Sequence, residues 1–160
     1  MRLDKFLANT GLGSRAQVRK LIRSGQVTVD GATVKDPSFA FNPHRAIVIA
    51  AGAELEYREH HYLMLNKPPG VISATEDRLR TTVLDLLPPA YRHLKLFPVG
   101  RLDRDTQGLL LLTDDGAMAH NLLSPKKRVP KTYLALVQGW VGKKEQEAFA
   151  RGIALRDFTT

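Results

Sequence analysis

The chain has 160 residues, of which 43% are hydrophobic and 25% are charged, and it contains no cysteine. This composition is typical of a globular protein of one ordinary domain, or of a very small domain followed by a medium one. The absence of cysteine excludes disulfides and thiolate metal sites. Its apolar runs are far shorter than the roughly 20 residues of a membrane-spanning helix, and polar residues interrupt the first ten positions. We therefore expect no membrane helix and no secretion signal, and predict a cytoplasmic location.

The formal net charge is +8, and it is concentrated at two places. Residues 1–25 contain six basic residues and one acidic residue, residues 26–100 are balanced, and a second basic cluster follows near residues 126–131. Such patches attract polyanions, and without an apolar face rich in Trp or Phe they favour nucleic acid over a membrane. The candidate RNA-binding residues are Arg2, Arg15, Arg19, Lys20, Arg23, Lys126, Lys127, Arg128 and Lys131.

The first predicted elements are two helices and a hairpin. Apolar residues at helical spacing begin at Leu3, and glycines near residues 11–13 end that helix. Ser14 and Gln17 form a capping box for a second helix that stops at Gly25. The stretch VTVDGATV predicts a hairpin, and IVIA predicts another strand. Basic residues four apart put positive charge on one face of the second helix, as in an RNA-binding helix or an ordinary solvated one.

A second group of elements begins near Tyr62. The stretches YLMLN, VIS, LFPVGR, LLLLT and TYLALVQGWV predict strands, and LNKPPG contains a turn. TTVLDLLPP predicts a short helix stopped by two prolines, AMAHNLL a second helix, and KKEQEAFARGIAL a helix that ends at Gly152. Strands mixed with occasional helices, without a regular alternation, indicate an α+β domain with a mainly antiparallel sheet.

The densest polar cluster is the stretch GRLDRDTQG at residues 100–108, between two predicted strands. Loops held by strands commonly carry functional residues. The stretch also approaches a calcium-loop pattern that extends to Asp114, but four leucines occupy positions that would face the ion, and a strand replaces the entering helix. A surface turn of paired charges is the other alternative. We expect no metal site.

Residues 1–58 resemble the S4 RNA-binding domain. The resemblance lies in RLDKFLANTGLGSRAQVRKLIRSGQVTVDG, which is similar to the two helices and first hairpin of that family. It implies that the basic second helix faces RNA.

Residues 59–160 resemble the catalytic domain of the RsuA-type pseudouridine synthases, through LNKPPGVIS, GRLDRDTQGLLLLTDDG and KTYLALV. The resemblance implies that Asp103 is the catalytic residue, that Arg101 enters the space left by an extruded uridine, and that Tyr133 stacks on the flipped base. Asn66 and Lys67 are further candidates for substrate binding. SPKKRVPKTYLA resembles the branch that modifies small-subunit ribosomal RNA.

Pseudouridine formation oxidises nothing and adds no atom, so we expect no cofactor. An aspartate is ionised at neutral pH and attacks without a separate base to activate it. The expected partner is ribosomal RNA or a ribosomal subunit assembly intermediate, and the expected state is a monomer. The alternative function is a non-catalytic S4-type RNA-binding protein in ribosome assembly. The family's arginine-rich motif does not follow Gly152, so we expect a catalytic domain that is incomplete at its C-terminus.

Overall fold

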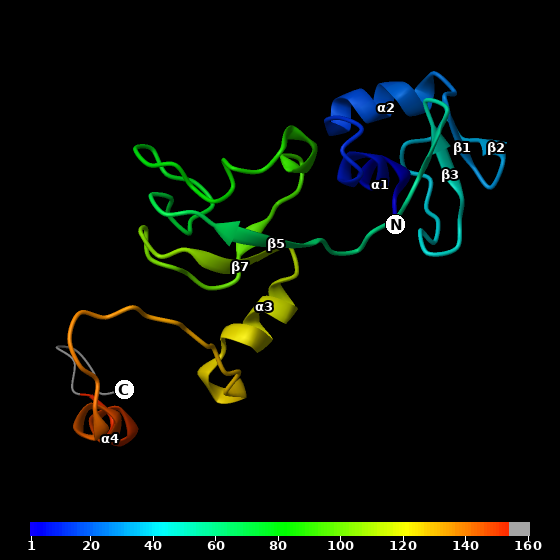
Figure 1. Ribbon diagram of the computed structural model, residues 1–160. Helices are drawn as coiled ribbons and strands as arrows, with labels where there is room; N and C mark the ends of the chain where they lie inside the picture. Colours follow the sequence, from blue (N-terminus) through cyan, green and yellow to red (C-terminus); the bar gives the residue numbers. More distant parts are fainter. Residues whose placement is uncertain (154–160) are drawn as a thin grey trace. The chain divides into compact units, whose positions relative to one another are not determined.

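The computed structural model describes residues 1–153 and contains two compact units, Met1–Val129 and a second that begins at Pro130. Short helices and two antiparallel sheets make up the first unit (Figure 1). The predicted α+β class is therefore confirmed.

Two helices open the first unit, α1 (Leu3–Asn9) and α2 (Arg15–Arg23). The predicted capping box of α2 is present: the Gln17 amide N–H donates to Ser14 Oγ at 3.4 Å, and the Ser14 N–H donates to Gln17 Oε1 at 2.8 Å. These bonds satisfy two backbone donors that the helix itself leaves without partners. The apolar faces of α1 and α2 are buried, so their basic residues remain at the surface.

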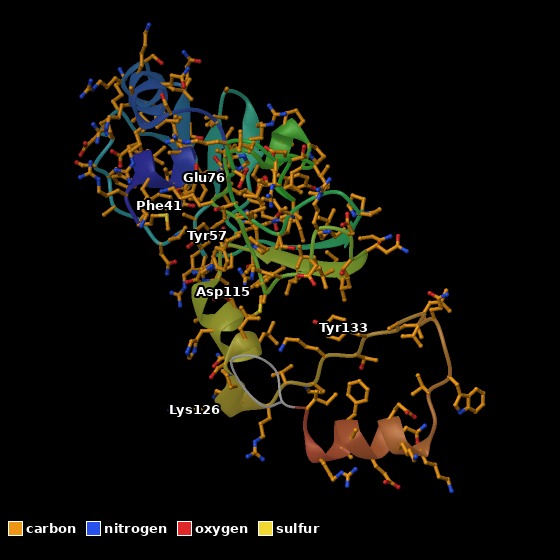
Figure 2. All side chains as sticks on the ribbon, turned by 90° about the vertical axis from the view of Figure 1, so that its left-hand side faces the viewer. Phe41, Tyr57, Glu76, Asp115, Lys126 and Tyr133 are labelled. Atoms are coloured by element: carbon orange, nitrogen blue, oxygen red, sulfur yellow. The ribbon has the colours of Figure 1, made fainter. Side chains whose placement is uncertain are left out.

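A four-stranded sheet in the order β2-β1-β3-β4 follows the helices. Its strands are β1 (Val27–Val29), β2 (Ala32–Thr33), β3 (Val48–Ala50) and β4 (Ala53–Leu55). The predicted hairpin turn lies between β1 and β2, where Asp30 and Gly31 have φ of 50° and 80°. Helices and sheet share one core of Leu3, Phe6, Leu7, Val18, Ile22, Val27, Val29, Val48 and Ala50. Phe41, labelled in Figure 2, packs edge-on against Phe6 with 5.3 Å between ring centroids.

The second sheet has the order β5-β7-β6 and is antiparallel throughout. Its strands are β5 (Tyr62–Lys67), β6 (Phe97–Pro98) and β7 (Gly108–Thr113), with β5 beside β7 (Figure 1). A separate core of Val71, Val83, Leu110 and Leu112 lies against this sheet. The connection between β6 and β7 contains the GRLDRDTQG stretch, so the sheet fixes both ends of that loop. Helix α3 (Gly116–Leu123) and the 3-10 turn η2 (Pro125–Lys127) follow β7.

The prediction of a helix over TTVLDLLPP is wrong, because this stretch forms a series of turns before a 3-10 turn, η1 (Pro89–Tyr91). Asp85 Oδ2 accepts hydrogen bonds from the Thr82 N–H at 2.7 Å and the Thr82 hydroxyl at 2.9 Å. Together with the Asp85 N–H, which donates to Thr82 Oγ1 at 3.4 Å, these bonds form a capping box like that of α2. The backbone on either side of Thr82 pairs with the VIS stretch instead of continuing as a helix, since the Ile72 N–H donates to the Thr81 carbonyl at 3.1 Å and the Val83 N–H donates to the Ile72 carbonyl at 3.0 Å. The VIS stretch forms one isolated bridge, Ile72 to Thr82, rather than a strand.

The second unit contains α4 (Lys143–Arg151), whose end at Gly152 agrees with the prediction. Ala154 and Leu155 of the predicted helical stretch lie outside the described residues. The expected strand over TYLALVQGWV is absent from the described part of the chain, where these residues are irregular. Leu134, Leu136 and Trp140 are almost fully exposed. A strand forms only when a neighbouring strand accepts its backbone hydrogen bonds, and local sequence does not supply that neighbour.

No helix within residues 1–153 combines the length and the apolar character needed to cross a membrane.

Candidate active site

Lys67 lies at the end of β5 and is completely buried. Its ammonium Nζ donates to the backbone oxygens of Arg104 at 2.9 Å, Thr106 at 2.8 Å and Pro68 at 3.1 Å. An ammonium has three N–H donors, so these contacts use its full capacity. A buried charge is tolerated when it is hydrogen-bonded in this way. Lys67 therefore ties the loop after Asp103 to the end of β5.

Ser73 and Gly70 also hold this loop. The Ser73 hydroxyl donates to the Leu102 carbonyl at 2.8 Å, and the Leu102 N–H donates to Ser73 Oγ at 3.0 Å. The Gly70 N–H donates to the Arg104 carbonyl at 2.9 Å, in a turn where Gly70 has φ of 84°. Gly70 and Ser73 both belong to LNKPPGVIS. The structure thus brings LNKPPGVIS and GRLDRDTQG together, although 29 positions separate Ser73 from Leu102.

Asp103 lies between these fixed points. The residues on either side of it, Leu102 and Arg104, have their backbones bonded to Ser73, Gly70 and Lys67, whereas the Asp103 side chain is exposed. The Thr106 N–H also donates to the Asp103 carbonyl at 3.1 Å, which closes a tight turn. An accessible carboxylate on a rigid backbone is suited to nucleophilic attack, because positioning is established before the substrate arrives.

The other candidate substrate-binding residues lie in different surroundings. Arg101 is exposed in the same loop, two residues before Asp103. Asn66 is exposed on β5, and strand alternation places it on the opposite face from Lys67. Tyr133 belongs to the second unit, where its ring is largely exposed on the irregular segment before α4 (Figure 2).

The basic candidates are all exposed, but two of them have an internal partner. Arg2 and Arg19 both contact the buried carboxylate of Asp4, at 3.1 and 3.0 Å. Lys126, labelled in Figure 2, and Lys127 are in η2, and Arg128 follows with a left-handed backbone at φ 48°. Lys131 belongs to the second unit. The remaining exposed basic candidates are Arg15, Lys20 and Arg23 on α2.

Sequence reasoning missed Ser73 and Asp4 as candidates. A signal was available for each: Ser73 ends the LNKPPGVIS motif, and Asp4 is the single acidic residue in the basic first 25 positions. Sequence reasoning did identify Lys67, but predicted that it would contact substrate. In the structure its ammonium donates to three backbone carbonyls, and its contact with substrate stays a prediction.

Asp114 joins the start of β5 to the end of β7. Its Oδ1 accepts the His61 N–H at 2.8 Å, and its Oδ2 lies 2.8 Å from His61 Nδ1. Burial alone raises the pKa of the Asp114 carboxyl. The hydrogen bonds from the His61 backbone and ring lower this pKa by more than burial raises it, so the net pKa lies below the ordinary value of 3.8. The neighbouring His60 Nδ1 is 3.5 Å from Asp114 Oδ1.

We expect Asp114→Asn to lower the free energy of unfolding by about 1 kcal/mol at pH 7, since one of the two oxygen acceptors is lost. The folded-state pKa is depressed, so the contribution of the carboxylate is present above 3.8 and disappears as the pH falls through the folded-state value. Denaturant unfolding at pH 7, 4 and 3 should show the gap between parent and variant closing. Asp105→Asn, in an exposed loop, is the control. A gap that stays constant with pH would contradict this assignment.

The calcium-loop pattern does not gather its residues in space. Asp114 follows the six residues of β7, and a strand of this length separates Asp114 from the loop by about 20 Å. The Asp114 carboxylate bonds to His61. Within residues 1–153, no group of three or more His, Asp or Glu side chains is placed to hold a metal ion.

Comparison with known proteins identifies two families along the chain. The model for RNA pseudouridylate synthase matches residues 61–156, and that for the S4 domain matches residues 1–47. The RNA pseudouridine synthase YtzG of Bacillus subtilis is 48% identical over 153 residues, which cover 96% of this chain and 64% of the relative. Ribosomal small subunit pseudouridine synthase A of Salmonella typhimurium is 40% identical, covering 98% of this chain and 68% of the relative.

A solved structure described as a crystal structure of pseudouridylate synthase is 32% identical with a TM-score of 0.49, and the match covers 99% of this chain and 67% of that one. The chain spans about two thirds of the length of the two pseudouridine synthase relatives that it matches. More than half of the chain matches the catalytic family model, behind a match to the S4 domain. The chain therefore belongs to the RNA pseudouridylate synthase family and carries an S4 domain ahead of the catalytic domain.

Proposed function

We propose that the protein converts a uridine of ribosomal RNA to pseudouridine, with Asp103 as the nucleophile. The observation that supports this most strongly is the exposed Asp103 carboxylate on a loop whose backbone is bonded on both sides to Lys67, Gly70 and Ser73. The family match makes this chemistry the natural use of such a carboxylate.

In the proposed reaction the Asp103 carboxylate forms a transient bond to the nucleotide. The bond between ribose C1′ and uracil N1 breaks with its electron pair going to N1, the base turns, and C1′ bonds to C5. C5 then loses its proton and N1 takes one up, so product and substrate are isomers. The carboxylate leaves at the end, so nothing is oxidised or reduced. Arg101 fills the space left by the extruded nucleotide, where a planar cation stacks and contacts phosphate. Tyr133 stacks on the flipped base, and Asn66 is proposed to contact substrate.

The division of labour that we propose places RNA binding in residues 1–58 and catalysis in residues 59–160. The basic residues of α2 and of the cluster around Lys126 contact phosphates. Small-subunit ribosomal RNA is the proposed substrate, because the Salmonella relative is named for it and is 40% identical. A cytoplasmic location and a monomeric state stay predictions, as does the ribosomal assembly intermediate as a partner.

Release of tritium tests this function directly. The full-length gene product is incubated with transcribed small-subunit ribosomal RNA labelled with tritium at uridine C5, and we expect release that follows enzyme concentration and reaches one uridine per RNA. RNA binding is measured in parallel by filter retention. The assay is repeated with isolated small ribosomal subunits that contain the labelled RNA. Tight binding without tritium release from either the naked RNA or the subunits would instead favour the non-catalytic assembly protein.

A further inference from the structure

Asp4 is a buried acid in the most basic part of the chain. Its side chain is 4% exposed, although it lies in the first turn of α1. Carboxylates are almost never buried to this degree unless they are paired. The backbone around Asp4 is fixed as well, since its N–H donates to the Pro37 carbonyl at 3.0 Å and the preceding Leu3 N–H donates to the Phe39 carbonyl at 2.9 Å.

Two arginines converge on this one carboxylate. Arg2 donates through Nε to Oδ1 and through a terminal nitrogen to Oδ2, both at 3.1 Å, in the parallel geometry that fixes a guanidinium most firmly. Arg19, from α2, donates through Nε to Oδ2 at 3.0 Å, and its terminal nitrogen lies at the same distance. The hydrogen bond from Arg2 lowers the pKa of Asp4; burial opposes this, and the hydrogen bond from Arg19 adds to it.

The two guanidiniums keep much of their binding capacity. A guanidinium has five N–H donors, and the contacts with Asp4 engage those on Nε and one terminal nitrogen of each. The Arg2 and Arg19 side chains remain 54% and 44% exposed. Without Asp4, two neighbouring guanidiniums would repel each other and each would sample many rotamers. With it, they form a fixed pair of net charge +1 with donors facing solvent.

We propose that Asp4 is a positioning residue for RNA binding, which holds Arg2 and Arg19 together as a receptor for one phosphate of the RNA backbone. A phosphate offers the oxygens that guanidinium forks bind in pairs, and preorganised donors lose less side-chain entropy on binding than free ones. The proposal depends on the proposed function only in taking RNA as the ligand. The competing explanation is that Asp4 merely ties α1 to α2.

The sign of the effect of Asp4→Asn separates positioning from general attraction. The substitution raises the formal net charge from +8 by one, so attraction to a polyanion alone predicts tighter binding. Positioning predicts weaker binding, by about five- to tenfold at low salt, the scale of one lost hydrogen bond, and a plot of log affinity against log salt that is flatter by about 0.7 to 0.9. Glu54→Gln, at an exposed carboxylate on β4, is the matched control with the same change of charge.

The probe is transcribed small-subunit ribosomal RNA. Binding is measured by filter retention between about 50 and 200 mM salt, a range over which phosphate contacts change the affinity strongly. Asp4→Asn is also made in an Arg2→Gln/Arg19→Gln background, where positioning predicts no further loss. Tighter binding by Asp4→Asn, or an equal loss in that background, would overturn the proposal. Circular dichroism and thermal unfolding establish that the variants are folded.

If Asp4→Asn does not fold, Arg19→Lys takes its place, since it keeps the charge but removes the fork. Weaker binding by Arg19→Lys supports positioning, and unchanged binding overturns it. Because binding is measured without turnover, these results are independent of tritium release. Weaker binding by Asp4→Asn in a protein that releases no tritium would retain this proposal and reject the catalytic one, and the reverse pattern would do the opposite.

Discussion

Asp103→Asn in the full-length protein should reduce pseudouridine formation by roughly a thousandfold or more, the scale seen when a nucleophile is removed. Asparagine keeps the shape of the side chain but lacks the anionic oxygen that forms the bond to the nucleotide. The backbone contacts that hold the loop come from Lys67, Gly70 and Ser73 and do not involve the Asp103 side chain. The folded structure of the loop should therefore survive, and the loss should fall on kcat.

RNA binding should change little in the same variant, because the phosphate contacts are assigned to residues of α2 and to the cluster around Lys126. Removing one carboxylate beside RNA could even tighten the complex slightly through lower repulsion. Asp105→Asn is the control, since Asp105 is exposed in the same loop but carries no proposed bond to the nucleotide. Equal loss of tritium release in both variants would point to the loop as a unit, and full turnover by Asp103→Asn would eliminate the proposed nucleophile.

Local signals in the sequence were sufficient for much of the fold. The capping box of α2, the Asp30–Gly31 turn and the end of α4 at Gly152 each depend on residues within a few positions of one another. Their preferences are satisfied by short-range hydrogen bonds or by backbone conformations that few residues adopt. Such features form in nearly the same way whatever surrounds them, so their sequence patterns were reliable.

Features that depend on a distant partner could not be derived from those patterns. TTVLDLLPP has the composition of a short helix, but it forms turns whose backbone bonds to the VIS stretch: the Ile72 N–H donates to the Thr81 carbonyl, and the Val83 N–H donates to the Ile72 carbonyl. TYLALVQGWV alternates like a strand and lies irregular in the described chain. Family resemblance identified Asp103 as a candidate, whereas the contacts that hold its loop, from Lys67 and Ser73, span more than 25 positions. Only the folded chain reveals which carbonyls these side chains bind.

Lys67→Met is the second change from which we expect a large effect, and it distinguishes a structural role from substrate binding. Methionine fills a similar volume but donates no hydrogen bond, so the carbonyls of Pro68, Arg104 and Thr106 would lose their ammonium donor. The Arg104 carbonyl keeps the Gly70 N–H as a donor, so the loss falls on the Pro68 and Thr106 carbonyls. A carbonyl left unpaired away from water costs about 1–3 kcal/mol. Since local relaxation recovers part of this, we expect the free energy of unfolding to fall by about 3 kcal/mol. Denaturant unfolding at pH 7 measures it.

Activity should fall with stability in Lys67→Met even where the protein remains folded, because the loop that carries Asp103 loses its contact at Thr106 and one of its two contacts at Arg104. The loss should appear in kcat rather than KM, since the buried ammonium is not available to RNA. Asn66→Ala is the matched control: it is the neighbouring residue on β5 but is exposed, so its unfolding free energy should change by no more than about 0.5 kcal/mol, and any effect should fall on KM. A Lys67→Met protein of parental stability with a raised KM would show that Lys67 contacts substrate and that the loop is held without it.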